Sequence, residues 1–464
     1  MLIDEHDAEL GATKRGGPVQ VFFHPAGSPR RPAIVRGEGV YFWDSNGRRY
    51  IDASSGPVVN NLGHANMRVV KAMADQASKV AFAYPRMFES EANIELADLL
   101  TNLAGPGLER AFFVSGGSEA TETAIKFARQ YALTCGEAKR FKIIGREPGY
   151  HGATLGALSV TGDDHAEEIW GPMMRPMPKV PAPFTYRTPP NHTPETYARF
   201  CADALEEEIV RQGPDTVLAF IMEPVGGLAT GALVAPDIYF DLVRQICSRH
   251  GVLLIYDEVM SGAGRTGKFL AADHWPSARP DIVTLAKGVA AGYTPFGAVL
   301  ASREMVDAVA GAGGFMHSFT YFTNPLSCAV GVAVLREVVE RGLIDRAAQM
   351  GDRLRARLLG LQSELTIIGD VRGKGLLQAI ELVSDQKTKQ MIPLECMAPY
   401  RVQALGLENG IALYCRRTSR GKYGDWVMMS PPLVITEAEL DELIDRLRRT
   451  LLAFEDELRK GRTI

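Results

Sequence analysis

The sequence is poor in the features that mark secreted, membrane-spanning and nucleic-acid-binding proteins. Its six cysteines are scattered with no CxxC spacing, which argues for reduced thiols and against a disulfide framework or a zinc site. No stretch approaches the ~18 uncharged apolar residues of a membrane helix, and the first residues lack the apolar core of a signal peptide. A net charge of −4 offers no basic field to nucleic acid. We therefore expect a soluble, cytoplasmic protein with no metal and no nucleic-acid or membrane partner.

The length of 464 residues is too great for one compact core and predicts two domains. Between residues 66 and 330, short apolar runs alternate with helical segments, which indicates a large three-layer α/β domain around a mostly parallel sheet. Residues 1–65 are expected to form an irregular arm, to about residue 30, and then a hairpin with its turn at 45–47. Residues 331–464 read as a separate, smaller α+β domain. The Pro-rich segment 171–194 is predicted to be a surface loop.

Two apolar runs within Leu253–Phe296 end beside residues that can do chemistry. The first ends at Asp257, and Lys287 follows just past the end of the second, Ile282–Leu285. Because neighbouring parallel strands end at the same edge of a sheet, an acid and an amine would meet at one pocket. A fixed carboxylate facing a desolvated lysine suits pyridoxal phosphate, because the lysine forms a Schiff base with the aldehyde and the acid keeps the pyridine nitrogen protonated. The alternative is that both side chains are simply solvated.

A competing motif lies in the same stretch. Gly262–Lys268, GAGRTGK, has the spacing of a nucleotide-binding P-loop. However, Phe269 stands where that loop needs Ser or Thr to bind magnesium, and the acidic pair 257–258 comes where its strand would be. A nucleotide-binding α/β protein is therefore a remote alternative.

Further segments provide candidate ligand-binding groups. A predicted strand at 111–114 runs through Ser115–Ser118 into a helix, and the free N–H groups of such a helix start bind anions such as phosphate. The alternative is an ordinary helix with Ser118 as its N-cap. Tyr150 lies between glycines, where it can stack on an aromatic ligand, and a third apolar run leads to Glu223.

Seven motifs follow one another along the chain: SGGSEA, YHG, EP, DEVMSGAGRTG, LAKG, FTYFTNP and SPPL. In this order and spacing the chain from about Gly37 to Arg448 resembles the class III (omega) aminotransferases, which are pyridoxal-phosphate enzymes of fold type I. The resemblance implies an α/β fold with a large cofactor-binding domain and a smaller α+β domain formed by the two chain ends. It also assigns GAGRTG to the signature of that family rather than to a P-loop.

The resemblance implies a role for each motif. Lys287 would be the Schiff-base lysine and the general base that moves a proton between Cα and C4′, and Asp257 would pair with the pyridine N–H. Burial should lower the pKa of Lys287 toward neutrality. The other cofactor contacts that the resemblance implies are Ser115, Gly117 and Ser118 at the phosphate, Tyr150 over the ring face, Val259 behind the ring, His151 and Glu223 beside it, and Thr320 at the phosphate of the neighbouring subunit. The active unit would be a homodimer, or a tetramer of paired dimers.

For the substrate, Arg416 resembles the mobile arginine with which omega-aminotransferases bind a carboxylate. The alternative is that Arg416 or Arg417 is a surface charge. Phe23, Val58 and Tyr150 are expected to line the donor side, and the segment 417–426 looks longer than usual and is expected to reshape the entrance. The resemblance implies ping-pong transfer of an amino group from an amine or omega-amino acid to an α-keto acid, first of all pyruvate. An aminomutase or a decarboxylase on the same fold is the alternative.

Overall fold

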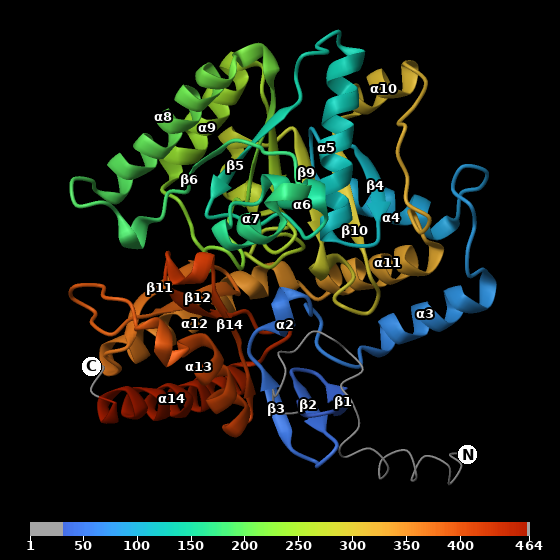
Figure 1. Ribbon diagram of the computed structural model, residues 1–464. Coiled ribbons are helices and arrows are strands. Elements are labelled where there is room, and N and C mark those ends of the chain that lie inside the picture. Colours follow the sequence, from blue (N-terminus) through green and yellow to red (C-terminus); the bar gives the residue numbers. More distant parts are fainter. Residues whose placement is uncertain (1–30, 462–464) are drawn as a thin grey trace.

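The computed structural model describes residues 31–461, and its centre is a seven-stranded sheet in the order β4–β10–β9–β8–β7–β5–β6 (Figure 1). Strand β10 runs antiparallel to both of its neighbours, and the pairs from β9 to β6 are parallel. The predicted mostly parallel sheet is therefore confirmed. Its strands are β4 (Arg110–Val114), β5 (Lys142–Glu147), β6 (Lys179–Pro181), β7 (Val217–Met222), β8 (Leu253–Asp257), β9 (Ile282–Ala286) and β10 (Gly297–Ala301).

The central strands are apolar because both faces of the sheet are covered. Every residue of β7 is buried. Ile221 and Ile255 share a cluster with the apolar face of helix α5 (Gly117–Thr134), whereas Phe220 and Tyr256 pack on the opposite side with residues of α9 (Asp237–His250). Together with α8 (Pro194–Gln212), these helices complete the predicted three layers.

The two chain ends build a smaller domain together (Figure 1). Strand β13 pairs in parallel with β3, so that Ile411 lies opposite Ile51. The predicted hairpin is present as β2 and β3. The strands of this domain are β1 (Ile34–Glu38), β2 (Tyr41–Asp44), β3 (Arg49–Asp52) and β13 (Ile411–Ala412) in one sheet, and β11 (Ile368–Lys374), β12 (Leu377–Leu382), β15 (Asp425–Met429) and β14 (Tyr414–Arg417) in another.

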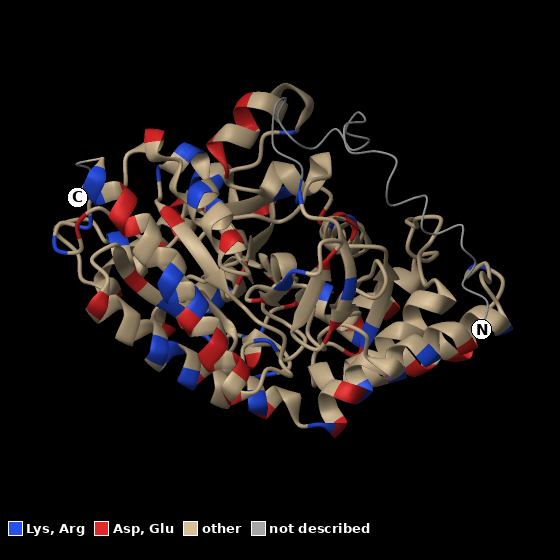
Figure 2. Cartoon of the chain, turned by 90° about the horizontal axis from the view of Figure 1, so that it is seen from below, with Lys and Arg blue, Asp and Glu red and all other residues tan. Residues whose placement is uncertain are grey.

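Helices cover the outer side of the smaller domain. Helix α14 (Glu437–Lys460) begins with a capping box between Thr436 and Glu439. It contacts α12 (Leu343–Glu364) through ion pairs such as that between Arg448 and Glu364, whose Nε and Oε2 atoms are 2.9 Å apart. Figure 2 shows positive and negative residues intermixed along the helices at this side of the molecule. Such exposed pairs contribute roughly 0–1 kcal/mol each.

The remaining helices connect these parts. Helix α11 (Pro325–Glu340) packs against α3 (Met67–Lys79) and α4 (Glu91–Ala104), and the domain boundary predicted at residue 330 lies inside it. The others are α2 (Ser55–Val58), α6 (Leu155–Val160), α7 (Asp164–Trp170), α10 (Arg303–Gly311) and α13 (Ala398–Glu408). No helix within residues 31–461 is long and apolar enough to cross a membrane.

The segment 171–194 corrects one prediction. It was expected to be a loop throughout, but it contains β6, which pairs in parallel with β5 and forms one edge of the main sheet. An edge strand has one unpaired side, so it tolerates Pro181, which cannot donate a hydrogen bond. Its three residues are too few to carry an alternating pattern that sequence alone could reveal.

Candidate active site

The carboxyl edge of the main sheet gathers the predicted acid, lysine and glutamate. Strands β7, β8 and β9 lie side by side in parallel, and Asp257 is paired in register with Thr284. Glu223 follows β7 and Lys287 follows β9. A cavity of about 320 Å³ opens here. Its lining residues are Pro57, Gly117, Ser118, Tyr150, His151, Gly152, Glu223, Val225, Leu228, Asp257, Val259, Met260, Lys287 and Tyr414.

Lys287 is held in the cavity by a strained backbone. Its φ of 42° lies in the left-handed region, which costs a residue other than glycine roughly 1–3 kcal/mol and is typical of functional sites. Burial lowers the pKa of its amine to about 8, although the carboxylates of Asp257 and Glu223 act in the opposite direction. Near neutral pH a useful fraction of the amine is therefore unprotonated and able to act as a nucleophile or base.

Asp257 is fixed on both oxygens. His151 donates from Nδ1 to Oδ2 over 2.8 Å, and the backbone N–H of Val259 donates to Oδ1 over 3.0 Å. Thr284 Oγ1 lies 3.4 Å from the same Oδ1. The other ring nitrogen of His151, Nε2, is buried and has no hydrogen-bond partner among the described residues. The carboxylate therefore has a fixed orientation, and the imidazole beside it retains an unused polar atom.

Glu223 connects the sheet to the loop that carries Tyr150. Its Oε1 accepts from the backbone N–H of Gly227 over 2.8 Å, and its Oε2 accepts from that of Tyr150 over 3.3 Å. Burial raises the pKa of Glu223; the nearby His151 opposes this shift, and Asp257 adds to it. The side chain therefore ties the backbone of Tyr150 to the loop that follows β7.

The start of helix α5 lines the cavity with Gly117 and Ser118. Its N-cap is Gly116, with no side-chain cap, so the interpretation of Ser118 as N-cap is wrong. The Ser118 hydroxyl accepts instead from the backbone N–H of Ala153 over 3.0 Å, because Ser118 already lies within the first turn. A Cβ at Gly117 would lie 2.9 Å from Val259 Cγ1, so only glycine fits between helix and strand end. The first-turn N–H groups remain directed at the cavity.

Four other predicted residues do not line this cavity, and a fifth is not described by the structure. Val58 is buried in the core, and its neighbour Pro57 faces the cavity instead. Ser115 donates its N–H to Glu119 over 2.8 Å, and Thr320 is exposed in a turn. Arg416 lies outside the lining. Phe23 falls outside the described residues.

Sequence reasoning missed six lining residues. Gly152, Met260 and Pro57 are direct neighbours of His151, Val259 and Val58, and Tyr414 lies two residues before Arg416, so nearness along the chain was a usable signal. Leu228 and Val225 carry no chemical group that would mark them, and only the folded chain brings them to the cavity.

The two adjacent arginines of β14 have different surroundings. Arg417 is bound to Asp425 through two hydrogen bonds of 2.6 Å each. Arg416 has a buried Nε without a hydrogen-bond partner and forms no ion pair with any carboxylate of residues 31–461. Burial raises the pKa values of Tyr150 and Tyr414, and the charge of Arg416 opposes both shifts, which places it near the cavity rim.

The P-loop interpretation of GAGRTGK is wrong. Residues 262–268 form a series of turns and bends that does not lead into an α-helix. Arg265 is fully buried and donates to Asn61 Oδ1 over 2.6 Å and to the carbonyl of Pro431. The guanidinium therefore joins the large domain to both chain ends instead of facing a nucleotide.

Comparison with known proteins agrees with this site. The chain matches the family model for class-III aminotransferases over residues 24–451 and belongs to that family. It is 37% identical over 439 residues to the uncharacterized aminotransferase YodT of Bacillus subtilis, covering 94% of this chain and 98% of YodT. The putrescine–pyruvate aminotransferase of Pseudomonas aeruginosa is 32% identical, with 90% of each chain covered. A solved omega-transaminase of Thermomicrobium roseum superposes with a TM-score of 0.88 at 37% identity, covering 94% of this chain and 96% of that one.

Class III aminotransferases use pyridoxal phosphate, and the residues present fit this group. The cavity offers a helix start for a phosphate, an aromatic side chain in Tyr150, a fixed carboxylate and a buried amine. The unpartnered Nε2 of His151 provides one further polar atom beside the carboxylate. These are the groups that an anionic, aromatic aldehyde requires.

Proposed function

We propose that this aminotransferase is an omega-aminotransferase that moves an amino group from an amine or omega-amino acid to an α-keto acid by a ping-pong mechanism. The observation that carries the proposal is Arg416, a guanidinium near the cavity rim that no described carboxylate neutralises. Arg416 is free to bind the carboxylate of a keto acid in one half-reaction. In the other half-reaction, an amine without an α-carboxylate enters and Arg416 binds no substrate group.

Pyridoxal phosphate supplies an aldehyde that takes up the amino group and a ring that accepts electrons from the substrate. Lys287 Nζ would hold the aldehyde in the resting enzyme and would then carry a proton from the substrate Cα to the aldehyde carbon. Its depressed pKa, about 8, suits both tasks. Asp257 would hold the proton on the pyridine nitrogen, and His151 keeps the carboxylate oriented. Tyr150 and Val259 would contact the ring, and the start of α5, at Gly117 and Ser118, would bind the phosphate.

Pyruvate is the acceptor we favour. The relative from Pseudomonas aeruginosa is named for putrescine and pyruvate, and the small size of pyruvate suits a cavity that the cofactor largely fills. A second cavity, of about 570 Å³, adjoins the first and shares Pro57 and Tyr414 with it. This second cavity offers room for the longer part of an amine donor.

We also propose a homodimer. Phe82, Met87, Phe88, Met316 and Tyr321 are large apolar side chains exposed on this chain, and the rings of Phe82 and Tyr321 lie 6.4 Å apart, edge to face. An exposed apolar patch of this kind marks an interaction surface. Thr320 is exposed beside Tyr321, where a second copy could bring it to the other subunit's phosphate site. Sedimentation equilibrium tests the proposal: a monomer at micromolar concentration would contradict it.

The assay for the function is product formation. The protein loaded with pyridoxal phosphate is mixed with a panel of amines and omega-amino acids plus pyruvate or 2-oxoglutarate, and alanine or glutamate is measured. Lys287→Ala should abolish turnover and the borohydride-sensitive visible band. Release of carbon dioxide, or isomerisation of the donor without a new amino acid, would instead identify a decarboxylase or an aminomutase.

A further inference from the structure

The turn between β14 and β15, residues 418–424, crosses from the smaller domain to the large one. Lys422 Nζ lies 2.7 Å from Glu147 Oε1 and 3.1 Å from Asp164 Oδ2. The hydroxyl of Tyr423 donates to the same Glu147 oxygen over 2.8 Å. Farther out, Arg420 pairs with Glu168 of α7. We call residues 418–424 the crossing turn.

The backbone of the crossing turn is strained. Ser419 and Arg420 have φ values of 46° and 54°, and Gly421 follows with 88°. Two consecutive residues other than glycine in the left-handed region persist only where their surroundings hold them. Thr418 and Ser419 are buried accordingly. The conformation therefore depends on the contacts with the large domain, and such strain is common at functional sites.

The chain leads to the active site from both residues of the Lys422–Glu147 ion pair. Glu147 ends β5, and the chain continues within four residues through Tyr150 to His151. On the other side, the crossing turn continues β14, which carries Arg416. Lys422 and Tyr423 thus join the strand that carries Arg416 to the loop that carries Tyr150.

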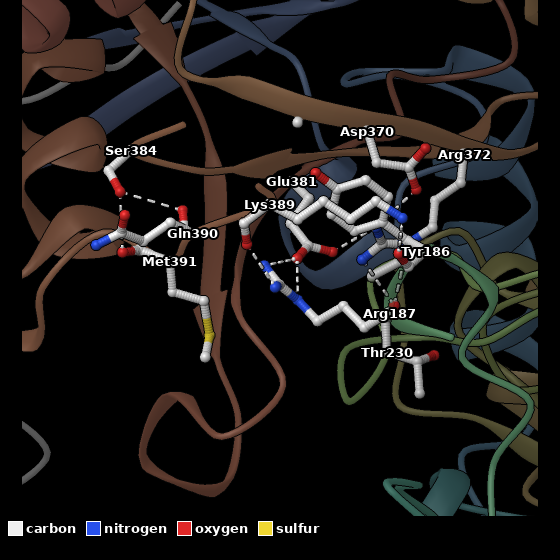
Figure 3. A network of polar contacts seen from close by, with 12 residues as sticks. Tyr186, Arg187, Thr230, Asp370, Arg372, Glu381, Ser384, Lys389, Gln390 and Met391 are labelled. Atoms are coloured by element: carbon white, nitrogen blue, oxygen red, sulfur yellow. Dashed lines mark hydrogen bonds and ion pairs between the residues drawn. The ribbon is translucent and has the colours of Figure 1, made fainter. Parts of the chain in front are cut away.

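A buried ionic network lies beside the end of the crossing turn, where β15 begins (Figure 3). Arg372 Nη1 lies 2.7 Å from Glu381 Oε2, and Arg187 Nε donates to Glu381 Oε1 over 2.7 Å. Arg372 Nε also donates to the carbonyl of Gly231 over 2.7 Å. Gly424 passes so close that a Cβ there would lie 2.7 Å from Glu381 Oε1. The network therefore fixes Gly424 and the start of β15, and the contacts of Lys422 and Tyr423 with Glu147 hold the preceding part of the turn against the large domain.

We propose that Lys422 is a positioning residue that, through Glu147, sets the separation of Arg416 and Tyr150 and thereby the affinity for the keto acid carboxylate. This inference rests on the proposed role of Arg416. Carboxylate recognition by a guanidinium requires placement within about 0.5 Å, so a loosened turn weakens acceptor binding. Donor deamination depends on Lys287 and Asp257, which follow strands β9 and β8 of the main sheet. The turn reaches Asp257 only indirectly, through the hydrogen bond from His151, so the donor half-reaction should change less than acceptor binding.

The effect should be moderate. The side chain of Lys422 is 51% exposed and that of Glu147 is 32% exposed, so solvent and salt screen the pair. Lys422→Met should raise KM for pyruvate about three- to tenfold and change the rate of the donor half-reaction by less than about twofold. Lys422→Arg, which keeps the charge, should restore most of the affinity. High salt should reduce the difference between Lys422→Met and the wild type.

Arg420→Met is the matched control. It removes the same charge from the same turn, but its partner Glu168 does not contact the loop 147–151. This variant should leave KM for pyruvate within about twofold of the wild-type value. An equal rise of KM in both variants would overturn the inference, as would an equal rise for pyruvate and donor in Lys422→Met.

Hydrogen exchange tests the link without reference to turnover. The backbone N–H groups of Gly149 and His151 donate to the carbonyl of Gly162 and to Thr161 Oγ1. Hydrogen exchange across residues 147–151 of the holoenzyme should be faster in Lys422→Met and in Glu147→Gln than in the wild type. The double variant should show the same acceleration as either single variant, and Arg420→Met should show none. Unchanged exchange would refute the link even if the wild type formed no alanine, and Glu147→Gln decides the question if Lys422→Met fails to fold.

Discussion

Replacing Arg416 by Ala tests the proposed acceptor site most directly. The guanidinium is partly buried, its Nε is already shielded from water and unpartnered, and no described carboxylate competes for it. Binding a carboxylate therefore costs little further desolvation on the protein side. A hydrogen bond to a charged group contributes about 1.5–3 kcal/mol, so Arg416→Ala should raise KM for pyruvate roughly 10- to 150-fold.

Steady-state kinetics with varied pyruvate and varied donor separate the two substrates. The donor half-reaction of an amine without a carboxylate, followed as loss of the visible aldehyde band, should stay within about twofold of wild type, because Arg416 has nothing to bind there. Arg417→Ala is the contrasting variant, since it leaves the buried Asp425 unpaired and should cost about 3–5 kcal/mol of stability, visible as a lower Tm. Equal effects of Arg416→Ala on pyruvate and donor would refute the assignment.

Further predictions concern the cofactor site. Capture of pyridoxal phosphate by the apoprotein, followed as growth of the visible band, should accelerate as the pH rises through about 8, because the neutral amine of Lys287 attacks the aldehyde; a rate independent of pH would contradict this. Gly117→Ala should weaken cofactor binding by placing a Cβ 2.9 Å from Val259, and adding Val259→Ala should restore it in a spectral titration. His151→Phe removes the donor to Asp257 Oδ2 and should weaken cofactor binding about 5- to 150-fold; unchanged affinity would show that the pair has no role.

Local patterns predicted much of the fold. The ends of strands β8 and β9 were expected within one residue of their positions, because a run of apolar residues between charged or glycine-rich ends has few alternatives. The capping box of α14 was readable from Thr436 and Glu439 alone. Strand β6 was missed because its three residues gain their structure from pairing with β5, which is a tertiary contact.

The candidate site, like the fold, could be predicted only in part from the sequence. Asp257, Glu223 and Lys287 could be predicted because each stands at the end of an apolar run, and parallel strands end at one edge. Pairing within the site could not be predicted. The hydrogen bond between His151 and Asp257 joins residues far apart in sequence, and nothing near His151 indicates which carboxylate it meets.

The sequence by itself determined the chemistry available to this protein: a lysine and an acid at strand ends, a small-residue helix start and a pair of arginines near the C-terminus. Only the tertiary structure decided which arginine of that pair is committed to Asp425 and which remains for a substrate. It also decided that residues 418–424 contact Glu147. The reason is physical, because side-chain charge and apolar periodicity are local properties, whereas ion pairing and burial depend on which distant segments the packed core brings together.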